Sequence, residues 1–127
     1  MGFETALQTA VFSALDGNIT ADVYDDPPKQ CDYPYVVIGD DSFIEFDTDT
    51  TVGRNVIASM HIWDNYNGKK RIKQAMGEID AILNRANLTI TGYDSINCVF
   101  DSSDIFLERD GKTRHGVITY RLLIDEE

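Results

Sequence analysis

Two segments of the chain place their apolar residues along a single helical face, and this pattern sets the class of fold. The first lies at about 3–16 and is followed by Gly17, a residue suited to the left-handed conformation that ends many helices. The second lies at about 69–86. Three polar residues before it are candidate N-caps: Asp64, Asn65 and Asn67. A helix with one apolar stripe needs a second layer to cover that stripe, so a sheet is expected.

The other apolar segments follow the pattern of paired strands. Residues 34–46 form an apolar run that is interrupted at 39–41, which indicates a bulge or a sharp bend. Residues 52–63 alternate in polarity, so their side chains are expected to point to opposite faces of a sheet. These two segments are predicted to form a hairpin joined through 47–51.

A second hairpin is predicted in the last third of the chain. Apolar residues alternate over 96–107, with an interruption at 101–104, and alternate again from Ile118 to Ile124. Asp110-Gly111 between these segments is a strong signal for a tight hairpin turn. Two shorter strands are expected at 22–24 and 88–90.

Together these elements predict an α+β fold of two layers. The sheet is expected to be mostly antiparallel and built from two long hairpins, with both amphipathic helices packed on one face. A chain of 127 residues is long enough to bury a substantial apolar core without disulfides or metals. Residues 1–127 are therefore expected to form a single domain.

The charge balance argues against several classes of function. The chain has 22 Asp and Glu residues against 11 Lys and Arg, a formal net charge of −11. Such an acidic surface repels nucleic-acid backbones and anionic lipid headgroups, so neither specific DNA binding nor membrane docking is expected. No membrane span and no secretory signal are predicted. Cys31 and Cys98 are expected to be free thiols, and neither a metal site nor a cofactor is predicted.

Asp47-Thr48-Asp49-Thr50-Thr51 matches the D-x-D-x-T nucleophile loop of haloacid-dehalogenase-type phosphatases. In that chemistry the first carboxylate attacks phosphorus and the second protonates the leaving group. Those enzymes lead from this loop into a helix, whereas here a second strand is predicted to follow. The favoured interpretation is therefore a polar hairpin tip. A small phosphotransferase that uses Asp47 and Asp49 with magnesium remains an alternative.

The two histidines are interpreted as structural. His61 and Trp63 lie two apart on one strand face and are expected at the boundary between sheet and helix. His115 follows the second hairpin turn. No nucleophile or orienting partner is evident for either histidine, so no catalytic residue is predicted.

The chain has one basic cluster and, separately, a turn of mixed charge. Lys69-Lys70-Arg71 opens the second helix, where positive charge opposes the helix dipole. Nearby Asp residues are expected to compensate this charge, and a contact with an acidic surface such as another copy of the chain is the alternative. The turn 109–114 carries charges of both signs and is either an exposed turn or an interaction loop.

Several segments share an order and spacing with one known family. They are the opening helix 6–15, the loop 23–28, the strand 34–40, the segment His61–Asp64 with Gly68 and a helix after it, and the closing hairpin Arg109–Val117 with Tyr120-Arg121. In this order they resemble the tail terminator (tail completion) proteins of tailed bacteriophages and gene transfer agents. The likeness covers nearly the whole chain, although residues 47–51 are not part of the family's pattern.

The resemblance implies a small structural protein without catalytic activity that forms a ring, usually a hexamer. Such a ring caps the growing tail tube, ends its polymerisation and presents a surface for head docking. The implied partners are further copies of the chain, the tail tube protein and the head–tail connector (stopper) protein, while DNA passes through the ring without specific binding. The implied location is the tail–neck region of the virion, after assembly in the host cytoplasm.

Three groups of residues are the candidate contacts for such an assembly. They are Asp47, Asp49 and Arg54 at the first hairpin, Lys69, Lys70 and Arg71 at the start of the second helix, and Arg109, Lys112 and Arg114 at the second hairpin. A different kind of protein, an acidic adaptor that binds one basic partner through its surface, also fits the composition.

Overall fold

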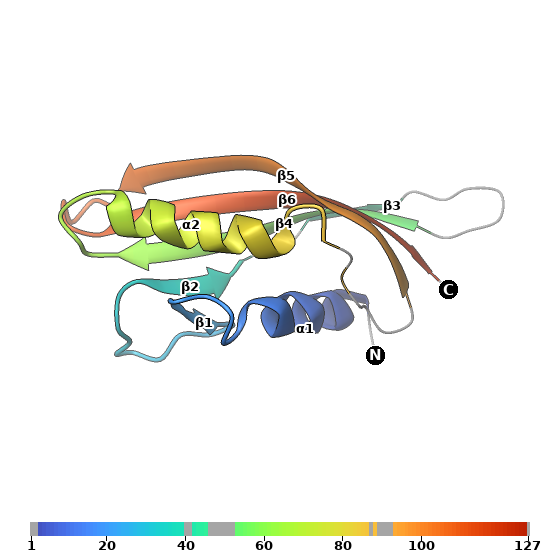
Figure 1. The fold of residues 1–127 in the computed structure, drawn as a ribbon, viewed down its shortest axis with the longest axis horizontal. Coiled ribbons are helices and arrows are strands. Elements are labelled where there is room, and N and C mark those ends of the chain that lie inside the picture. The colour runs from blue at the N-terminus through green and yellow to red at the C-terminus, as the bar shows by residue number, and fades with distance from the viewer. Residues whose placement is uncertain (1–2, 40–41, 46–52, 87, 89–92, 127) are drawn as a thin grey trace.

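The fold is taken from a computed structural model of the chain, which describes residues 3–39, 42–45, 53–86, 88 and 93–126. Two helices and six strands follow one another along these residues (Figure 1). In chain order they are α1 (Phe3–Leu15), β1 (Asp22–Tyr24), β2 (Tyr35–Ile38), β3 (Ser42–Glu45), β4 (Gly53–Asp64), α2 (Lys70–Leu83), β5 (Tyr93–Leu107) and β6 (Arg114–Glu126).

The strands form one sheet in the order β1-β2-β4-β6-β5, and β3 also pairs with β4. β1 and β2 are parallel, and every other pairing is antiparallel. The run predicted at 34–46 is divided between β2 and β3, which both pair with β4. Ile38 lies opposite Met60 and Ser42 lies opposite Ile57, so the predicted interruption at 39–41 separates two strands on one neighbour.

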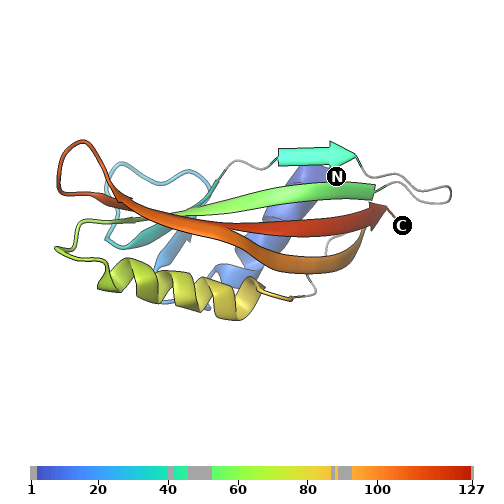
Figure 2. The ribbon, with the colours of Figure 1, turned by 90° about the horizontal axis from the view of Figure 1, so that it is seen from above.

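Both helices contribute to a single apolar core on one side of the sheet. In Figure 2, α1 passes behind β4 and β6, while α2 runs along the side of β5. Alternate residues of the two central strands point into this core: Val56, Ala58, Met60 and Ile62 from β4, and Ile118, Tyr120 and Leu122 from β6. The stripe of α2 covers them with Ile72, Ala75, Met76, Ile79 and Leu83. The predicted α+β fold of two layers is confirmed.

The close approach of α2 to the sheet depends on Gly116 of β6. A Cβ atom at this position would lie 2.8 Å from Ile72 Cγ2 and 2.8 Å from Met76 Cε. Beside this contact the Tyr120 hydroxyl donates a hydrogen bond of 2.9 Å to Asp80 of α2. Burial and this carboxylate raise the pKa of Tyr120, which keeps the phenol protonated and bonded to the helix.

The ends of α2 differ from the prediction. The predicted caps Asp64, Asn65 and Asn67 are wrong, because the helix begins after Lys69 and has no side-chain cap. Asp64 is instead the last residue of β4. The helix ends at Leu83 rather than near 86, since Asn84 is extended and Arg85 has a φ of 63°. The Arg85 N–H then donates to the Cys98 carbonyl of β5, which binds the chain after the helix to the sheet.

The second hairpin and the end of α1 agree with the prediction. α1 stops at Leu15, and Gly17 has a φ of 77°. β5 is one strand with register shifts at Ser95/Asn97 and Phe100/Ser102, the second of which lies at the interruption predicted from 101. Most of the short strand predicted at 88–90 lies outside the described residues. None of the helices in the described part of the chain is long and apolar enough to cross a membrane.

Candidate functional site

The start of α2 and the β5–β6 turn lie at the same end of the molecule (Figure 1, left). They meet there because Asp64, the last residue of β4, is paired with Arg114, the first residue of β6. We call residues 64–73 and 108–115 the basic end. It holds seven of the eleven basic residues of the chain: Lys69, Lys70, Arg71, Lys73, Arg109, Lys112 and Arg114.

The basic end is strongly polarised against the rest of the chain. It contains seven basic residues and only three acidic residues, Asp64, Glu108 and Asp110, so its formal charge is +4. The rest of the chain then carries a formal charge of −15, and the two parts together give the total of −11. Lys69, Lys70, Arg109 and Lys112 are exposed at this end. The basic cluster at the start of α2 and the turn of mixed charge, which the sequence predicted separately, therefore lie at the same end of the molecule (Figure 1).

Arg71 differs from its neighbours because it serves the fold. Its Nε donates a hydrogen bond of 3.2 Å to Asp64 Oδ2, and its second nitrogen donates to Oδ1. The Asp64 side chain is fully buried, whereas the Arg71 side chain is 36% exposed. The guanidinium also lies over the Tyr66 ring, 5.2 Å from its centroid. The predicted compensation of the basic cluster by a nearby Asp is confirmed for Arg71.

The tip of the β5–β6 hairpin is held by Asp110. Its Oδ1 accepts hydrogen bonds of 2.8 Å from the N–H groups of Lys112 and Thr113, and its Oδ2 accepts one of 2.6 Å from the Thr113 hydroxyl. Gly111 adopts a φ of 71°, which favours glycine. This turn presents the side chains of Arg109 and Lys112 outward from an ordered frame.

This frame predicts an acid-resistant tip. The Thr113 hydroxyl and the N–H groups of Thr113 and Lys112 lower the pKa of Asp110 from 3.8 to about 2. Because the folded pKa lies below the unfolded one, the stabilisation is complete above about pH 4 and is lost as the pH falls through about 2. Carbon-13 NMR of the carboxyl group measures this directly. The control Thr113→Val should move the Asp110 titration back toward 3.8, and a native midpoint near 3.8 would contradict the prediction.

The remaining candidate contacts do not join the basic end. Asp47 and Asp49 lie outside the described residues, so the D-x-D-x-T interpretation gains no geometry. Arg54 lies near the start of β4, where its backbone is paired with Glu45 and Ile124. This is the end of β4 opposite Asp64, so the backbone of Arg54 lies away from the basic end.

His61 and His115 meet on the sheet face opposite the helices, an arrangement that the sequence analysis missed. His61 Nδ1 lies 2.6 Å from His115 Nε2, and His115 Nδ1 lies 3.0 Å from Glu108 Oε1. The expected position of His61 and Trp63 at a sheet–helix boundary is wrong, because alternation along β4 places them away from Met60 and Ile62, which face the helices. The pairing of Trp63 with His115 is the register from which the contact follows.

Aromatic rings continue from this pair across four strands. Tyr35, Trp63, His115 and Phe106 lie opposite one another in the registers of β2, β4, β6 and β5. The Trp63 and His115 rings are stacked with centroids 3.8 Å apart, and Phe106 lies 4.7 Å from His115. Ring contacts across the strands therefore brace β4, β6 and β5 in this row.

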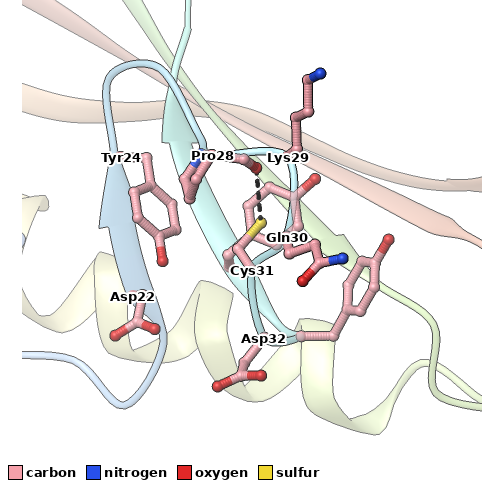
Figure 3. A pocket seen from close by; sticks show the side chains of 9 residues that line it. Asp22, Tyr24, Pro28, Lys29, Gln30, Cys31 and Asp32 are labelled. Carbon is pink, nitrogen blue, oxygen red and sulfur yellow. Dashed lines mark hydrogen bonds between the residues drawn. The ribbon is translucent and has the colours of Figure 1, made fainter.

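A shallow pocket of about 520 Å³ lies beside β1 and β2 (Figure 3). Its lining includes Asp22, Asp32, Tyr24, Tyr35 and Cys31. The Cys31 thiol donates a hydrogen bond of 3.7 Å to the Pro28 carbonyl. No histidine lines this pocket to serve as a base for the thiol.

The other groups with possible reactivity are the two cysteine thiols and the side chains that can bind metals. Cys31 and Cys98 are free, as predicted. Burial raises the pKa of Cys98 to about 12, which keeps that thiol protonated and unreactive. Within the described ranges, no group of three His, Cys, Asp or Glu side chains is placed to hold a metal ion.

The chain is similar to known proteins both in sequence and in fold. The sequence model of the family described as tail completion protein gp17 matches residues 5–125. The tail completion protein gp17 of Bacillus phage SPP1 is 27% identical over 125 residues, which cover 94% of this chain and 92% of that protein. A chain from the virion of a native gene transfer agent particle has the same fold, with a TM-score of 0.89, 21% identity and 98% of both chains covered.

These matches confirm the resemblance drawn from the order of the sequence segments. The family match extends over nearly the whole chain and includes both hairpins and both helices. The fold match extends over the same length. The chain therefore belongs to the tail completion protein gp17 family.

Proposed function

We propose that this protein forms a ring, a hexamer in the particle, that caps the tail tube, ends its polymerisation and offers the surface on which the head docks. The observation that carries the proposal is the match of residues 5–125 to a family of tail completion proteins. Its partners are then further copies of the chain, the tail tube protein and the head–tail connector protein. A structural role of this kind involves no catalysis.

The charge polarity supports contact between copies. The basic end carries +4 and the remainder of the chain −15, so another copy is itself an acidic partner for this surface. A contact between two different surfaces of identical subunits generates a ring when the rotation closes. We assign Lys69, Lys70, Arg109 and Lys112 to this contact because they are exposed at the basic end.

The acidity also suits passage of DNA through the ring. Six copies at −11 each make a strongly negative assembly. An acidic lumen does not neutralise phosphates or release their counterions, and so does not hold passing DNA.

Charge reversal tests the assignment of the basic end. The double variant Lys69→Glu/Lys70→Glu should raise the protein concentration required for assembly at least about tenfold, because it sets like charges against each other. Sedimentation with and without tail tube protein measures the assembled fraction. The matched control Lys29→Glu/Arg85→Glu changes the net charge equally at exposed sites outside the basic end and should assemble normally. Normal assembly of both double variants would remove the basic end from the proposal.

A further inference from the structure

The pocket beside β1 and β2 combines aromatic rings with carboxylates. Its lining includes three tyrosines and two aspartates: Tyr24, Tyr33, Tyr35, Asp22 and Asp32. The centroid of the Tyr35 ring lies 6.1 Å from that of Tyr24 and 5.4 Å from that of Tyr33. Three neighbouring rings and two carboxylates therefore border one cavity of about 520 Å³.

The charges of this pocket are unevenly placed. Figure 3 shows the Asp22 and Asp32 carboxylates at one end of the pocket, while the Lys29 amino group extends from the other end. Partial burial raises the pKa of Tyr24, and the nearby carboxylates of Asp22 and Asp32 raise it further. Within the described part of the chain, neither carboxylate forms an ion pair. Lys29→Glu in the charge-matched control above therefore leaves the rings and both carboxylates in place.

Rings and carboxylates around one cavity match the chemistry of a guanidinium group. Its flat face stacks on aromatic rings, and its N–H groups donate to carboxylate oxygens. An anion at the same place would face two negative charges. The ligand that fits is therefore an organic cation, and an arginine side chain makes both kinds of contact at once.

The position of the pocket in the sheet indicates where this arginine comes from. β1 and β5 stand at opposite edges of the strand order. Tyr35 of β2 belongs to the row of paired residues that ends at Phe106 of β5, so the pocket and the base of the β5–β6 turn lie at the same level along the strands. A second copy beside the first then brings its turn toward the pocket. Contact between two different edges of identical subunits generates a ring when the rotation closes.

Arg109 is the residue of this turn that best fits the pocket. Its side chain is exposed, and it lies beside the frame that Asp110 builds at the hairpin tip. The ion pairs among the described residues use other cations, so the Arg109 guanidinium has no acidic partner within that part of its own chain. It is thus available to an acidic partner on another molecule.

We propose that the pocket formed by the three tyrosines with Asp22 and Asp32 receives the Arg109 side chain of a neighbouring copy. The guanidinium stacks on the tyrosine rings and pairs with the two carboxylates. This contact supplies the acidic surface that the basic end meets in the ring. The choice of a second copy as the occupant rests on the proposed function, whereas the selectivity of the pocket for a guanidinium group does not.

A small guanidinium probe tests the pocket on the full chain without assembly. N-acetyl-arginine amide is titrated into the wild type and followed by NMR of the tyrosine rings, where the signals of Tyr24, Tyr33 and Tyr35 should shift. N-acetyl-citrulline amide has nearly the same shape without the charge and should bind at least about fivefold more weakly. Equal binding of the two probes, or no shift with either, would overturn the proposal.

Paired variants of the carboxylates show which charges the probe recognises. Asp22→Asn/Asp32→Asn should weaken binding of the arginine probe at least about fivefold. Asp25→Asn/Asp26→Asn makes the same change of net charge at two exposed residues of the same segment that do not line the pocket, and it should bind the probe as the wild type does. Equal losses in both double variants would mean that only net charge attracts the probe, which contradicts the proposed pocket.

Sedimentation of the same variants tests the occupant. Asp22→Asn/Asp32→Asn should raise the concentration required for assembly at least about fivefold, and Asp25→Asn/Asp26→Asn should not. When combined with Arg109→Ala, the pocket variant should add little further loss, because both changes remove one interaction.

The outcomes separate this inference from the proposed function. Additive effects of Arg109→Ala and the pocket variant, or normal assembly of the pocket variant, would overturn the Arg109 contact and leave the ring in place. A wild type that binds the arginine probe but never assembles would overturn the proposed function, and with it the second copy as occupant, but not the selectivity of the pocket.

Discussion

Arg71→Ala is expected to lower the free energy of unfolding by about 3 kcal/mol, the largest loss predicted for a single residue of the basic end. The substitution leaves the fully buried Asp64 carboxylate without its cation. We place the effect at the lower end of the range for broken buried pairs because the Arg71 side chain is 36% exposed. Urea unfolding followed by circular dichroism measures the change.

Two further variants separate the ion pair from a general loss of charge. Lys70→Ala removes the neighbouring exposed cation and should change stability by less than about 0.5 kcal/mol. Asp64→Leu/Arg71→Met replaces both partners with apolar side chains and should cost less than Arg71→Ala alone. Equal stabilities of Arg71→Ala and Lys70→Ala would contradict the described pair. Because Arg71 serves the fold, its loss cannot report on assembly, which is why the charge-reversal test uses Lys69 and Lys70.

Gly116→Ala should destabilise the protein by about 1–3 kcal/mol, because the added methyl group enters the packed contact between β6 and α2. The new Cβ would lie 2.8 Å from Ile72 Cγ2 and from Met76 Cε, so these two core side chains must shift. Thermal unfolding measures the loss of stability.

Gly77→Ala is the matched control for Gly116→Ala, since it makes the same chemical change within α2. Apart from its chain neighbours and the backbone of the helix itself, no atom lies within 4 Å of a Cβ at Gly77, and alanine favours the helix. This variant should therefore be more stable by about 0.5–1 kcal/mol. Opposite signs for the two glycines are expected, and a stabilising Gly116→Ala would contradict the packing of α2 on β6.

The fold was predictable from local patterns because its elements have clear periodicity. The apolar stripe from Ile72 to Leu83 predicted α2, and Asp110-Gly111 predicted the turn between β5 and β6. The start of α2 was not predictable in the same way. Asp is a residue type that often caps helices. Here, however, the Asp64 carboxylate accepts hydrogen bonds from Arg71, seven residues along the chain, and does not cap the helix.

The segments of the candidate site were predictable from the sequence, but their position next to one another in the fold was not. The sequence indicates a basic cluster at Lys69-Lys70-Arg71 and, separately, a turn of mixed charge at 109–114. Their meeting at one end depends on the register of β4 with β6, which sets Asp64 opposite Arg114. The contact of His61 with His115 depends on the same register, across 54 positions of sequence. The partner of a histidine on a strand can therefore be predicted only when the order and register of the strands are known.

The native mass across a range of concentrations, alone and with tail tube protein, is the measurement that decides whether this chain works as a ring. We predict a species near six times 14.3 kDa, either in solution or after addition of tubes, and a cap at tube ends in electron micrographs. A monomer at every concentration that leaves tube ends bare and tube growth unchanged would contradict the proposed function.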